Sequence, residues 1–494
     1  MAIARPSDLF DRVQEWSDIA DFAATPGPGI MLGIVSGRRR QGKSVLLRRL
    51  AAATGGFYTM ALEQEREPAL RRLSSALARA LDLPDGALVL PDWTTAWRTL
   101  LRPRGGGGPR VVVVDELPYL LRHSPELPSA LQEVIDESRS DPSWPPVRLI
   151  LCGSALAVMG QLLSGTQALR GRARLDLTVR AFDVRQTAEF WQVPDAETAF
   201  ALHAVVGGTP GYRDLIGAGP APGADGLAQW LAGSLLNPSH AMFREAEYLL
   251  TEDPRLTDRA LYHSVLAGVS AGARTPTALG GLLGRPASSL EHPLNVLASA
   301  GYLRRDDDVL LQRRPRLRVS DPVLRFDQVV RRPRLAQLED RRTAAAWNDA
   351  LPAFRSAVLG PHFEDLARWW TGRHDGWPLP VGEVGSTVVN DRAGRSQHEV
   401  DVVALTAGQR RQARDAEVLV LGEAKAGDRT RGVGEVVRLE RVRALLTSRG
   451  VAAERAVLAV FGQAGFTPEL QALAETRADV VLVDLAAMLA DPAL

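Results

Sequence analysis

The first third of the chain contains three runs of mostly apolar residues, and each run ends in polar residues. They lie at 31–36 (MLGIVS), 111–116 (VVVVDE) and 147–154 (VRLILCGS). Such runs are typical of strands buried in a parallel sheet. A helical pattern, SVLLRRLAAA, follows the first run after a short loop. The order of strand, loop and helix predicts an α/β fold with a parallel sheet.

The middle of the chain changes to helical periodicity. After the polar, proline-bearing stretch at 217–226, residues 259–305 show the pattern of three helices. The segment DDDVLLQRRPRLRV that follows is predicted to form a turn and a strand, which gives the outline of a winged helix-turn-helix module. Pro293 falls inside the third helix and should kink or shorten it.

The last third again alternates between helix and strand patterns. A helical stretch at 353–370 precedes strand-like runs at 381–389, 398–405 and 417–424. A helix at 435–447 and further alternation of strand and helix complete the segment. This order predicts a second α/β domain.

Composition narrows the class of protein. A length of 494 residues favours about three domains. Hydrophobic residues at 45% and charged residues at 24% are ordinary values for a globular protein. The sequence has no apolar signal region at its start and no stretch long enough to span a membrane, so a cytoplasmic location is expected. Cys152 is the single cysteine, which excludes an internal disulfide and a cysteine-based zinc site. The net charge of +1 leaves the question of a nucleic-acid partner open.

Lysine is almost absent from this arginine-rich chain. Only Lys43, in GRRRQGKS, and Lys425, in GEAK, are lysines among the 59 basic residues. Arginine serves wherever a general positive charge suffices, so a retained lysine indicates a position that needs a compact ammonium group. The two motifs therefore predict two active sites.

Residues Gly37–Ser44 fit the pattern GxxxxGK[ST] of a phosphate-binding loop. Backbone N–H groups of such a loop and the helix N-terminus surround a phosphate, and Gly37 and Gly42 permit the close approach. Lys43 is predicted to reach the terminal phosphates, and the Ser44 hydroxyl to ligate magnesium. We also count the neighbouring Gln41 and Val45 among the nucleotide-binding residues.

The second apolar run supplies the acidic partners of this loop. It follows the glycine-rich stretch PRGGGGP at 103–109. Asp115 is predicted to hold the magnesium shell, and Glu116 to orient or deprotonate the attacking water. Ser154, at the end of the third run, is either a sensor of the terminal phosphate or an ordinary serine at a strand end.

Two related classes of nucleotide-binding protein are excluded by the sequence. LSGTQ at 163–167 resembles the signature peptide of ABC transporters, but it follows the acidic strand, whereas that peptide precedes it. Guanine-selective enzymes use an asparagine-lysine-x-aspartate motif, and both lysines are already assigned. ATP and Mg²⁺ are therefore the expected cofactors.

A second group of charged residues lies near the C-terminus. Asp401 falls on the strand-like run HEVDVV, and Glu423 and Lys425 flank Ala424 on the next run. Because side chains alternate along a strand, Glu423 and Lys425 share one face of the sheet. Two carboxylates that leave open magnesium positions suit phosphodiester hydrolysis.

The chain resembles archaeal-type P-loop ATPases of the AAA+ and STAND neighbourhood that carry a C-terminal nuclease-like domain. The likeness runs through FDRVQEW, GRRRQGKS, VVVVDELPYL, LILCGSALAVM, LRGR, GGTPGY, EVDVVA and GEAK, and so covers nearly the whole chain. It implies that Arg172 is an arginine finger or sensor, with Arg170 and Arg174 as alternatives. It also implies that 185–250 form a helical lid in which Gly207–Tyr212 make a tight turn facing the nucleotide.

The C-terminal motif resembles that of the PD-(D/E)xK nucleases. By this resemblance Asp401 and Glu423 hold magnesium, Lys425 positions or activates the attacking water, and Glu364 on the preceding helix completes the metal site. The fold can also be kept for binding alone.

DNA is the expected partner, through phosphate contacts that are largely independent of sequence. The best-placed basic residues follow the third helix on the predicted wing: Arg313, Arg314, Arg316 and Arg318. A homo-oligomer or a partner protein is also expected, and no membrane is.

These observations give one prediction for the whole chain. The expected domains are a P-loop ATPase core (1–182), a helical lid (183–255), a winged helix-turn-helix (256–325), a linker (326–350) and a PD-(D/E)xK nuclease-like domain (351–494). The expected protein binds and hydrolyses ATP, associates with DNA and acts as an ATP-regulated, magnesium-dependent nuclease. The alternative is a STAND-like signalling or scaffold ATPase whose C-terminal domains contact proteins without cleavage.

Overall fold

The computed structural model describes residues 3–102, 110–165, 167–252, 256, 258–312, 315–391, 394–413 and 416–491. The chain forms two compact units. Unit 1 comprises Met1–Ala181 with Thr209–Gly211, and unit 2 comprises Phe182–Gly208 with Tyr212–Leu494. The glycine-rich stretch 103–109 and Thr166 of the LSGTQ segment lie outside the described residues.

Unit 1 is built on a five-stranded sheet in the order β2-β3-β4-β1-β5, in which every pairing is parallel. Its strands are β1 (Ile30–Ser36), β2 (Phe57–Met60), β3 (Arg110–Asp115), β4 (Val147–Gly153) and β5 (Ala173–Thr178). The predicted parallel sheet is thus confirmed. The apolar pattern did not indicate β2 or β5, because β2 is short and β5, at the edge, alternates half-buried and exposed residues.

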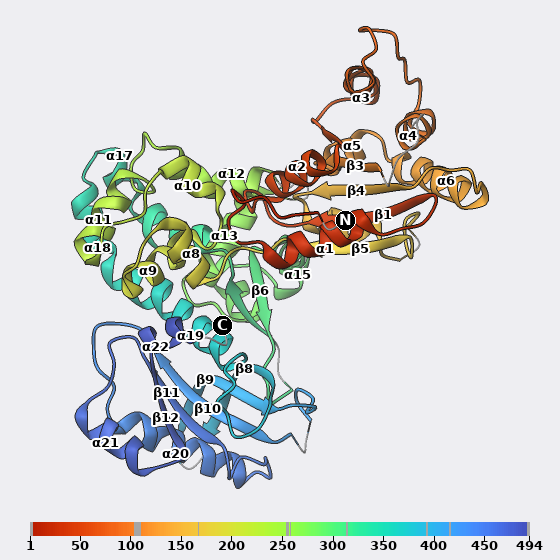
Figure 1. The fold of residues 1–494 in the computed structure, drawn as a ribbon. Helices are drawn as coiled ribbons and strands as arrows, with labels where there is room; N and C mark the ends of the chain where they lie inside the picture. Colours follow the sequence, from red (N-terminus) through yellow and green to blue (C-terminus); the bar gives the residue numbers. More distant parts are fainter. Residues whose placement is uncertain are drawn as a thin grey trace. The chain divides into compact units, whose positions relative to one another are not determined.

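Helices cover both faces of this sheet (Figure 1). The first face carries α1 (Val13–Ala24) and α2 (Lys43–Thr54). The other face carries α3 (Arg66–Ala80), α4 (Trp93–Leu101), α5 (Leu117–His123), α6 (Leu127–Ser140) and α7 (Leu156–Leu162). Leu46, Leu47 and Leu50 of α2 are at most 1% exposed, and burial of each contributes about 1.5–3 kcal/mol. The start of α2 is therefore held firmly at the carboxyl end of β1.

Unit 2 begins with a run of helices in the region where the sequence predicted a lid. They are α8 (Val184–Trp191), α9 (Ala196–Val206), α10 (Gly211–Ile216), α11 (Gly223–Gly233), η1 (Ala241–Arg244) and α12 (Glu245–Glu252). Asp183 caps α8 in a reciprocal capping box with Gln186, and Asp195 caps α9. Such caps satisfy N–H groups that a helix leaves unpaired at its start.

Three helices follow, as the sequence predicted, and then a hairpin of two strands where a turn and one strand were expected. The helices are α13 (Arg259–Ser270), α14 (Pro276–Leu283) and α15 (Glu291–Ser299), with a single 3-10 turn, η2 (Ala287–Leu290), before the last. Strands β6 (Leu303–Asp306) and β7 (Arg316–Val319) form the antiparallel hairpin. Pro293 lies in the first turn of α15, where its missing N–H is tolerated. The third helix is accordingly short.

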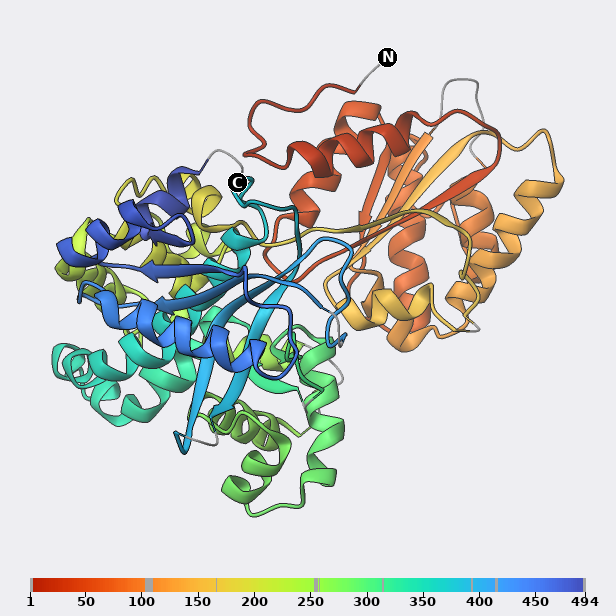
Figure 2. The ribbon, with the colours of Figure 1, turned by 90° about the horizontal axis from the view of Figure 1, so that it is seen from below.

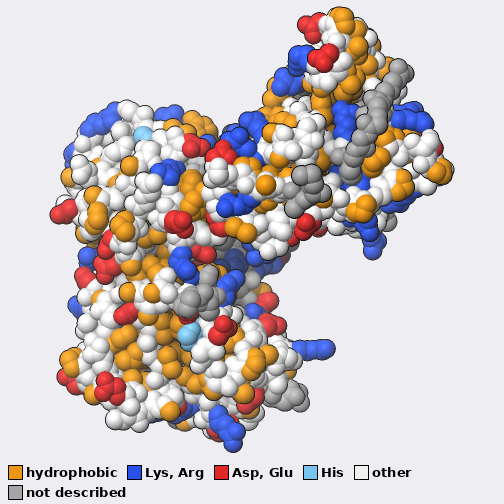
Figure 3. Space-filling view, in the orientation of Figure 1, with side chains coloured by type: hydrophobic (Ala, Val, Ile, Leu, Met, Phe, Trp, Pro, Cys, Tyr) orange, Lys and Arg blue, Asp and Glu red, His pale blue; other side chains and the backbone are white. Residues whose placement is uncertain are grey.

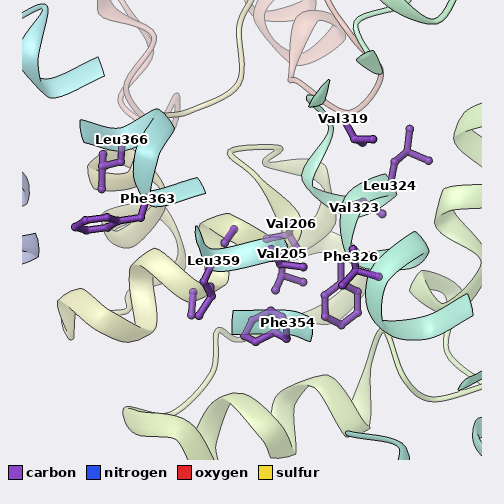
Figure 4. Close-up of a cluster of buried hydrophobic side chains, with 14 of the residues drawn as sticks. Val205, Val206, Val319, Val323, Leu324, Phe326, Phe354, Leu359, Phe363 and Leu366 are labelled. Atoms are coloured by element: carbon purple, nitrogen blue, oxygen red, sulfur yellow. The ribbon is translucent and has the colours of Figure 1, made fainter. Parts of the chain in front are cut away.

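The stretch 326–350, expected to be a linker, is folded. It continues α16 (Pro322–Phe326) through η3 (Asp327–Arg331), η4 (Arg332–Arg334), α17 (Leu335–Glu339) and α18 (Thr343–Ala353) to η5 (Phe354–Leu359) and α19 (Gly360–Thr371). Several of its apolar residues are buried, among them Val330 at 1% and Leu338 at 0% exposure. Figure 4 shows Val323, Phe326 and Phe354 gathered in this core.

The C-terminal part of unit 2 is a mixed five-stranded sheet in the order β12-β11-β10-β9-β8. The strands are β8 (Val381–Asp391), β9 (Ser396–Thr406), β10 (Val418–Lys425), β11 (Val457–Gly462) and β12 (Val480–Asp484). The pairs β8–β9 and β9–β10 are antiparallel, and the pairs β10–β11 and β11–β12 are parallel.

Helices lie on both faces of this second sheet. The helices that follow α19 are α20 (Val433–Thr447), α21 (Pro468–Thr476) and α22 (Leu485–Ala490). Phe363 of α19 packs in the cluster that holds Val402 and Val420, whereas Leu439 of α20 packs in the cluster that holds Val403 and Leu421. The α19 and α20 helices therefore cover opposite faces (Figures 1 and 2). No helix among the described residues is long and apolar enough to cross a membrane.

Candidate functional site

The predicted phosphate-binding loop joins β1 to α2 in unit 1. Gly37 has φ 154°, and a Cβ atom built there would lie 2.5 Å from the carbonyl oxygen of Val179. Gly42 has φ 88°, in the left-handed region that side chains rarely adopt. Both glycines are therefore required by the path of the loop.

Lys43 lies inside the loop and is only 4% exposed. Its Nζ donates a hydrogen bond to the carbonyl oxygen of Arg38 at 2.8 Å. Burial lowers the pKa of Lys43, and the neighbouring Cys152, Glu116 and Asp115 partly offset that effect. An anion bound in the loop would stabilise the charged ammonium further.

Gln41 fastens the loop at two points. Its side-chain Oε1 accepts a hydrogen bond from the backbone N–H of Arg38 at 2.8 Å. Its backbone oxygen accepts one from Nη2 of Arg12 at 3.1 Å. Arg12 is 7% exposed and also pairs with Glu15 at 2.7 Å. Sequence reasoning missed Arg12, because one arginine among so many gives no signal of its own.

The first turn of α2 faces the same loop. In an α-helix the first N–H groups have no partner within the helix, and here the first helical bond runs from Leu46 N–H to the Gly42 carbonyl at 3.0 Å. Ser44, whose hydroxyl is the predicted magnesium ligand, is half-buried. The Val45 side chain is 54% exposed, so only its backbone can serve a phosphate.

Asp115 lies fully buried at the carboxyl end of β3. Its Oδ2 accepts a hydrogen bond from the Tyr58 hydroxyl at 2.7 Å, and its Oδ1 accepts one from the backbone N–H of Glu116 at 2.9 Å. Burial and this bond to Asp115 raise the pKa of Tyr58. The tyrosine therefore stays a hydrogen-bond donor and holds the carboxylate in place.

Glu116 and Ser154 are brought together at the same edge of the sheet. The Ser154 hydroxyl donates to Oε2 of Glu116 at 2.8 Å, and the Ser154 backbone N–H lies 3.3 Å from the same oxygen. Glu116 has φ 54°, an uncommon conformation that clusters at functional sites. The direct partner of Ser154 is thus the Glu116 carboxylate.

The turn predicted to face the nucleotide reaches the loop. Thr209–Gly211 belong to unit 1, although the flanking residues belong to unit 2. The Gly211 N–H donates to the Arg40 carbonyl at 3.1 Å, and Pro210 is the nearest neighbour of a Cβ built on Gly42.

The structure does not bring Arg172 to the loop. Arg172 precedes β5, whose first paired residue, Ala173, lies opposite Leu32 at the amino end of β1. The loop lies at the other end of β1, about 15 Å away along the strand. The Arg172 guanidinium is held by Asp136 at 2.8 and 3.3 Å.

The two alternatives to Arg172 also have partners near the amino edge of the sheet. Arg170 donates to the Gly165 carbonyl at 2.7 Å. Arg174 lies 3.7 Å from the sulfur of Met31. Within unit 1, residues 170–174 therefore lie near the amino edge of the sheet, away from the loop, and the role of an arginine finger or sensor stays a prediction.

The parallel sheet, the glycine-dependent loop and the acidic residues at one edge define the class of unit 1. A buried lysine, a hydroxyl at the helix start and two carboxylates meet where the strands end. Unit 1 has the fold of a P-loop nucleoside triphosphatase.

The second predicted site forms on β9 and β10 in unit 2. The register pairs Gly422 with Val402, so the next residues, Glu423 and Asp401, face each other. Lys425 Nζ lies 3.1 Å from Oδ2 of Asp401 and 2.5 Å from Oε1 of Glu423. Asp401 is 4% exposed and Glu423 is 1% exposed. The structure thus brings together the three residues that the sequence singled out.

A register shift accompanies Asp401. Gly385 pairs with Val403 and Thr387 pairs with Val400, so β9 carries one more residue than β8 between these pairs. Bulges of this kind re-aim side chains and are frequent beside active sites. The Asp401 carboxylate also accepts a hydrogen bond from the Ala424 N–H at 3.0 Å.

The charges of this site are strongly coupled. Burial raises the pKa of Asp401, and the neighbouring Glu423 raises it further. Burial also raises the pKa of Glu423, against the lowering effect of Lys425. Although burial alone would lower it, Asp401 and Glu423 raise the pKa of Lys425. Lys425 therefore remains positively charged between the two carboxyl groups.

Arg438 of α20 is a further member of the site that the sequence did not indicate. Its Nη1 pairs with Oε1 of Glu423, and its Nη2 donates to the Glu399 carbonyl at 2.6 Å. The second oxygen of Glu423, Oε2, is buried and has no hydrogen-bond partner among the described residues. An orphaned carboxylate oxygen next to a second carboxylate fits a divalent cation, which supplies positive charge for phosphodiester chemistry.

Glu364 does not join this site. It lies on α19, the helix on the other face of the sheet, and its Oε2 pairs with Arg318 at 3.0 Å and with Arg368 at 3.6 Å. The parts of the chain that the structure describes contain no group of three or more His, Cys, Asp or Glu residues able to hold a metal ion. A magnesium ion here would have Asp401 and Glu423 as its protein ligands and water in its other positions.

The arginines of the predicted DNA-binding wing have protein partners. Arg316 pairs with Glu399. Arg318 is 16% exposed in its side chain and pairs with Glu364. Arg313 and Arg314 lie outside the described residues. Strand β7 therefore turns its basic side chains toward the C-terminal part of unit 2, which takes Arg316 and Arg318 away from a phosphate backbone.

Comparisons with known proteins support no closer assignment. No protein-family model matches the chain. An uncharacterized protein of Methanocaldococcus jannaschii is 23% identical over 184 residues, 37% of this chain, and the match spans only 38% of that relative.

Two solved structures illustrate the likeness at the level of fold. A Walker-type ATPase of Pyrococcus abyssi is 20% identical with a TM-score of 0.47, covering 66% of this chain and 97% of its own. The ORC2 protein of Aeropyrum pernix, bound to ADPNP and ADP, is 14% identical with a TM-score of 0.45, covering 70% and 97%. At these values the likeness carries no conclusion about function.

Proposed function

We propose that the chain binds ATP with magnesium and hydrolyses it. The observation that carries the proposal is the meeting of Lys43, Asp115 and Glu116 at the carboxyl edge of the sheet. Phosphoryl transfer requires charge neutralisation and positioning more than covalent chemistry. Lys43, already buried in the loop, supplies a fixed positive charge for the terminal phosphates.

Magnesium would be held by Ser44 and Asp115. The fit rests on Asp115, whose two oxygens each accept one hydrogen bond, because a carboxylate oxygen has lone pairs for more than one contact. The cation would neutralise charge on the phosphate oxygens. Glu116 accepts the proton of the attacking water or orients that water, and Ser154 fixes the rotamer of Glu116 for this task.

Nucleotide binding is tested by calorimetry on wild type and two Lys43 variants. Lys43→Ala should abolish ATP binding. Lys43→Arg should also fail, since a planar guanidinium cannot replace the ammonium within the tight loop. Arg49→Ala, a change at an exposed arginine of α2, is the control and should bind as wild type does. Wild-type affinity in Lys43→Ala would show that ATP binds elsewhere.

A second function, magnesium-dependent cleavage of nucleic acid, is favoured by the group formed by Asp401, Glu423 and Lys425. Asp401 and Glu423 supply two hard oxygen ligands, and Lys425 adds a positive charge for the attacked phosphate. Arg438 holds Glu423 from α20. This arrangement resembles a PD-(D/E)xK site with two carboxylates rather than three.

DNA association in this proposal does not rest on the wing. Arg316 and Arg318 are engaged by acidic side chains, and Figure 3 shows basic and acidic side chains interspersed on the visible face. The order of three helices and a hairpin is the order of elements in a winged helix-turn-helix module, and in such a module α15 would be the reading helix. A homo-oligomer or a partner protein, in the cytoplasm, remains part of the proposal.

The alternative is a switch or scaffold ATPase whose C-terminal part contacts proteins. Strand scission separates the two proposals. Purified protein with magnesium or manganese, with and without ATP, is incubated with linear, branched and single-stranded DNA. Scission that depends on Lys425 supports the nuclease, and intact DNA under every condition supports the scaffold.

A further inference from the structure

A cavity of about 220 Å³ lies within unit 2, and none of the residues assigned to the two sites described above lines it. We call it the arginine cavity. It is lined by the end of α13, by β7, by Arg325 of α16 and by residues near η5: Val269, Ser270, Ala271, Gly272, Arg274, Leu317, Arg318, Val319, Arg325, Ser356, Ala357 and Pro361. Three of these residues are arginines, and none of them is acidic.

Arg325 is the unusual member of this lining. It is 5% exposed, and its Nε and Nη1 are buried without a hydrogen-bond partner among the described residues. The adjacent Leu324 and Phe326 pack into the apolar core of unit 2 (Figure 4). An arginine stays charged in a protein, and a buried charge whose donors lack hydrogen-bond partners is unfavourable. The position therefore calls for an anion.

The other two arginines already have partners. Arg318 pairs with Glu364 at 3.0 Å, and Arg274 pairs with Glu399 at 2.9 Å. Ser270, the last residue of α13, adds a second unsatisfied group, because its Oγ is buried and has no hydrogen-bond partner in the described part of the chain. Two guanidinium nitrogens and one hydroxyl that lack a hydrogen-bond partner thus belong to two residues that line the same cavity.

The carboxyl end of α13 works against an anion but does not outweigh the arginines. A helix end carries about half an elementary negative charge, whereas Arg325 alone contributes a full positive charge. Burial lowers the pKa of Arg325; Asp365 and Asp321 offset part of that effect, whereas the neighbouring Arg318 and Arg304 add to it. The cavity therefore still favours a negatively charged ligand that carries hydrogen-bond acceptors.

We propose that the arginine cavity binds the phosphate group of a small molecule, with phosphate oxygens accepting hydrogen bonds from Arg325 and Ser270. A phosphate monoester carries about −1.5 to −2 charges and three acceptor oxygens, which suits several donors better than a carboxylate does. The cavity volume of about 220 Å³ exceeds the volume of a few water molecules, which take about 30 Å³ each in the liquid, so the cavity has room for more than isolated waters. Val269, Leu317 and Val319 offer an apolar wall to an organic group attached to the phosphate.

The test is calorimetric titration at constant ionic strength with two probes, inorganic phosphate and AMP. It is done in a Lys43→Ala background, which removes the phosphate-binding loop of unit 1 as a competing site. Saturable binding is expected, together with a rise in the unfolding temperature that grows with probe concentration. A tighter titration with AMP than with phosphate would identify a phosphorylated organic molecule, and equal affinity would identify free phosphate.

Variants locate the binding. Arg325→Met should weaken binding at least tenfold and, without phosphate, should leave unit 2 as stable as the parent or more so, because an unpaired buried charge is removed. Ser270→Ala should weaken binding several-fold and provides the test if Arg325→Met does not fold. Arg355→Met, at an exposed arginine of η5, is the matched control and should bind as the parent does. Absence of saturable binding, or parental affinity in both Arg325→Met and Ser270→Ala, would overturn the proposal.

Discussion

The hydroxyl of Ser154 donates a hydrogen bond to Oε2 of Glu116 at 2.8 Å. Each of the two residues directly follows a strand, β4 and β3 respectively, and these strands are neighbours in the sheet. Glu116 is also held in a left-handed backbone conformation. Two constraints therefore fix the carboxylate that we assign to the attacking water. Orientation of a catalytic group is a large part of its contribution to rate.

Loss of this hydrogen bond should slow ATP hydrolysis with little change in binding. Ser154→Ala is expected to lower kcat about tenfold, which corresponds to about 1.4 kcal/mol, with ATP affinity within a factor of about two. Ser154→Thr, which keeps a hydroxyl, should retain most of the rate. Steady-state phosphate release checks both variants. An unchanged kcat in Ser154→Ala would mean that Ser154 is an ordinary serine at a strand end and does not contribute to hydrolysis.

Arg12 should prove important for nucleotide affinity although it lies outside the loop motif. Its bond to the Gln41 carbonyl is charge-assisted, and such bonds contribute about 1.5–3 kcal/mol. Arg12→Met should weaken ATP binding roughly tenfold or more, as measured by calorimetry. Arg49→Met, at an exposed arginine of α2, is the control. Equal affinities in the two variants would mean that the loop keeps its shape without Arg12.

The two proposed activities should separate by mutation, because their residues belong to different units. Asp401→Ala and Lys425→Ala should each remove DNA scission and leave ATP hydrolysis at the wild-type rate. Arg438→Met should reduce scission, since it frees Glu423 from its partner on α20. Gel assays of strand scission and phosphate release on the same preparations measure both outcomes. Scission that survives Lys425→Ala would come from another site or another protein.

Unit 2 should lose stability on mild acidification. His203 is half-buried and His362 is buried, and their ring nitrogens lie 2.8 Å apart. Burial lowers the pKa of His203 to about 4 and lowers that of His362 well below its ordinary value. The unfolded chain binds protons from about pH 6.5 downward, while the folded chain does not until lower pH. The free energy of unfolding should therefore fall as pH decreases from 6.5 to 4, by up to about 1.4 kcal/mol per pH unit for each histidine.

Denaturant unfolding between pH 4 and 7.5 measures this effect. His203→Gln should reduce the pH dependence, even though loss of the buried bond lowers stability at pH 7. His292→Gln, at an exposed histidine, should leave the slope unchanged. A wild-type free energy of unfolding that does not change over this range would contradict the assigned role of the pair.

The sequence predicted those features that depend on local pattern. The loop from Gly37 to Ser44, the strand ending at Asp115 and the alternation that places Glu423 beside Lys425 all follow from short stretches. Backbone geometry decides each of them, through strand periodicity or the conformational freedom of glycine. The order of the central strands could not be read in this way, although their parallel character could.

Side-chain partners across long sequence separations could not be predicted. Arg318 and Glu364 are 46 residues apart and meet because β7 packs near α19. Their pairing withdraws one residue from the expected DNA contact and the other from the expected metal site. Arg172 lies away from the loop of unit 1 because it precedes β5, an edge strand that the apolar pattern did not indicate. Arg12 and Arg438 escaped notice because arginine is so common in this chain.

The most direct test of the central claim is phosphate release from ATP in the presence of magnesium, measured for wild type and Glu116→Gln under conditions where both bind ATP. The wild-type protein should release phosphate, and Glu116→Gln should bind ATP with similar affinity while release falls by at least a hundredfold. Equal rates of release from the two proteins, or no release from the wild type with and without DNA, would contradict the claim that unit 1 hydrolyses ATP.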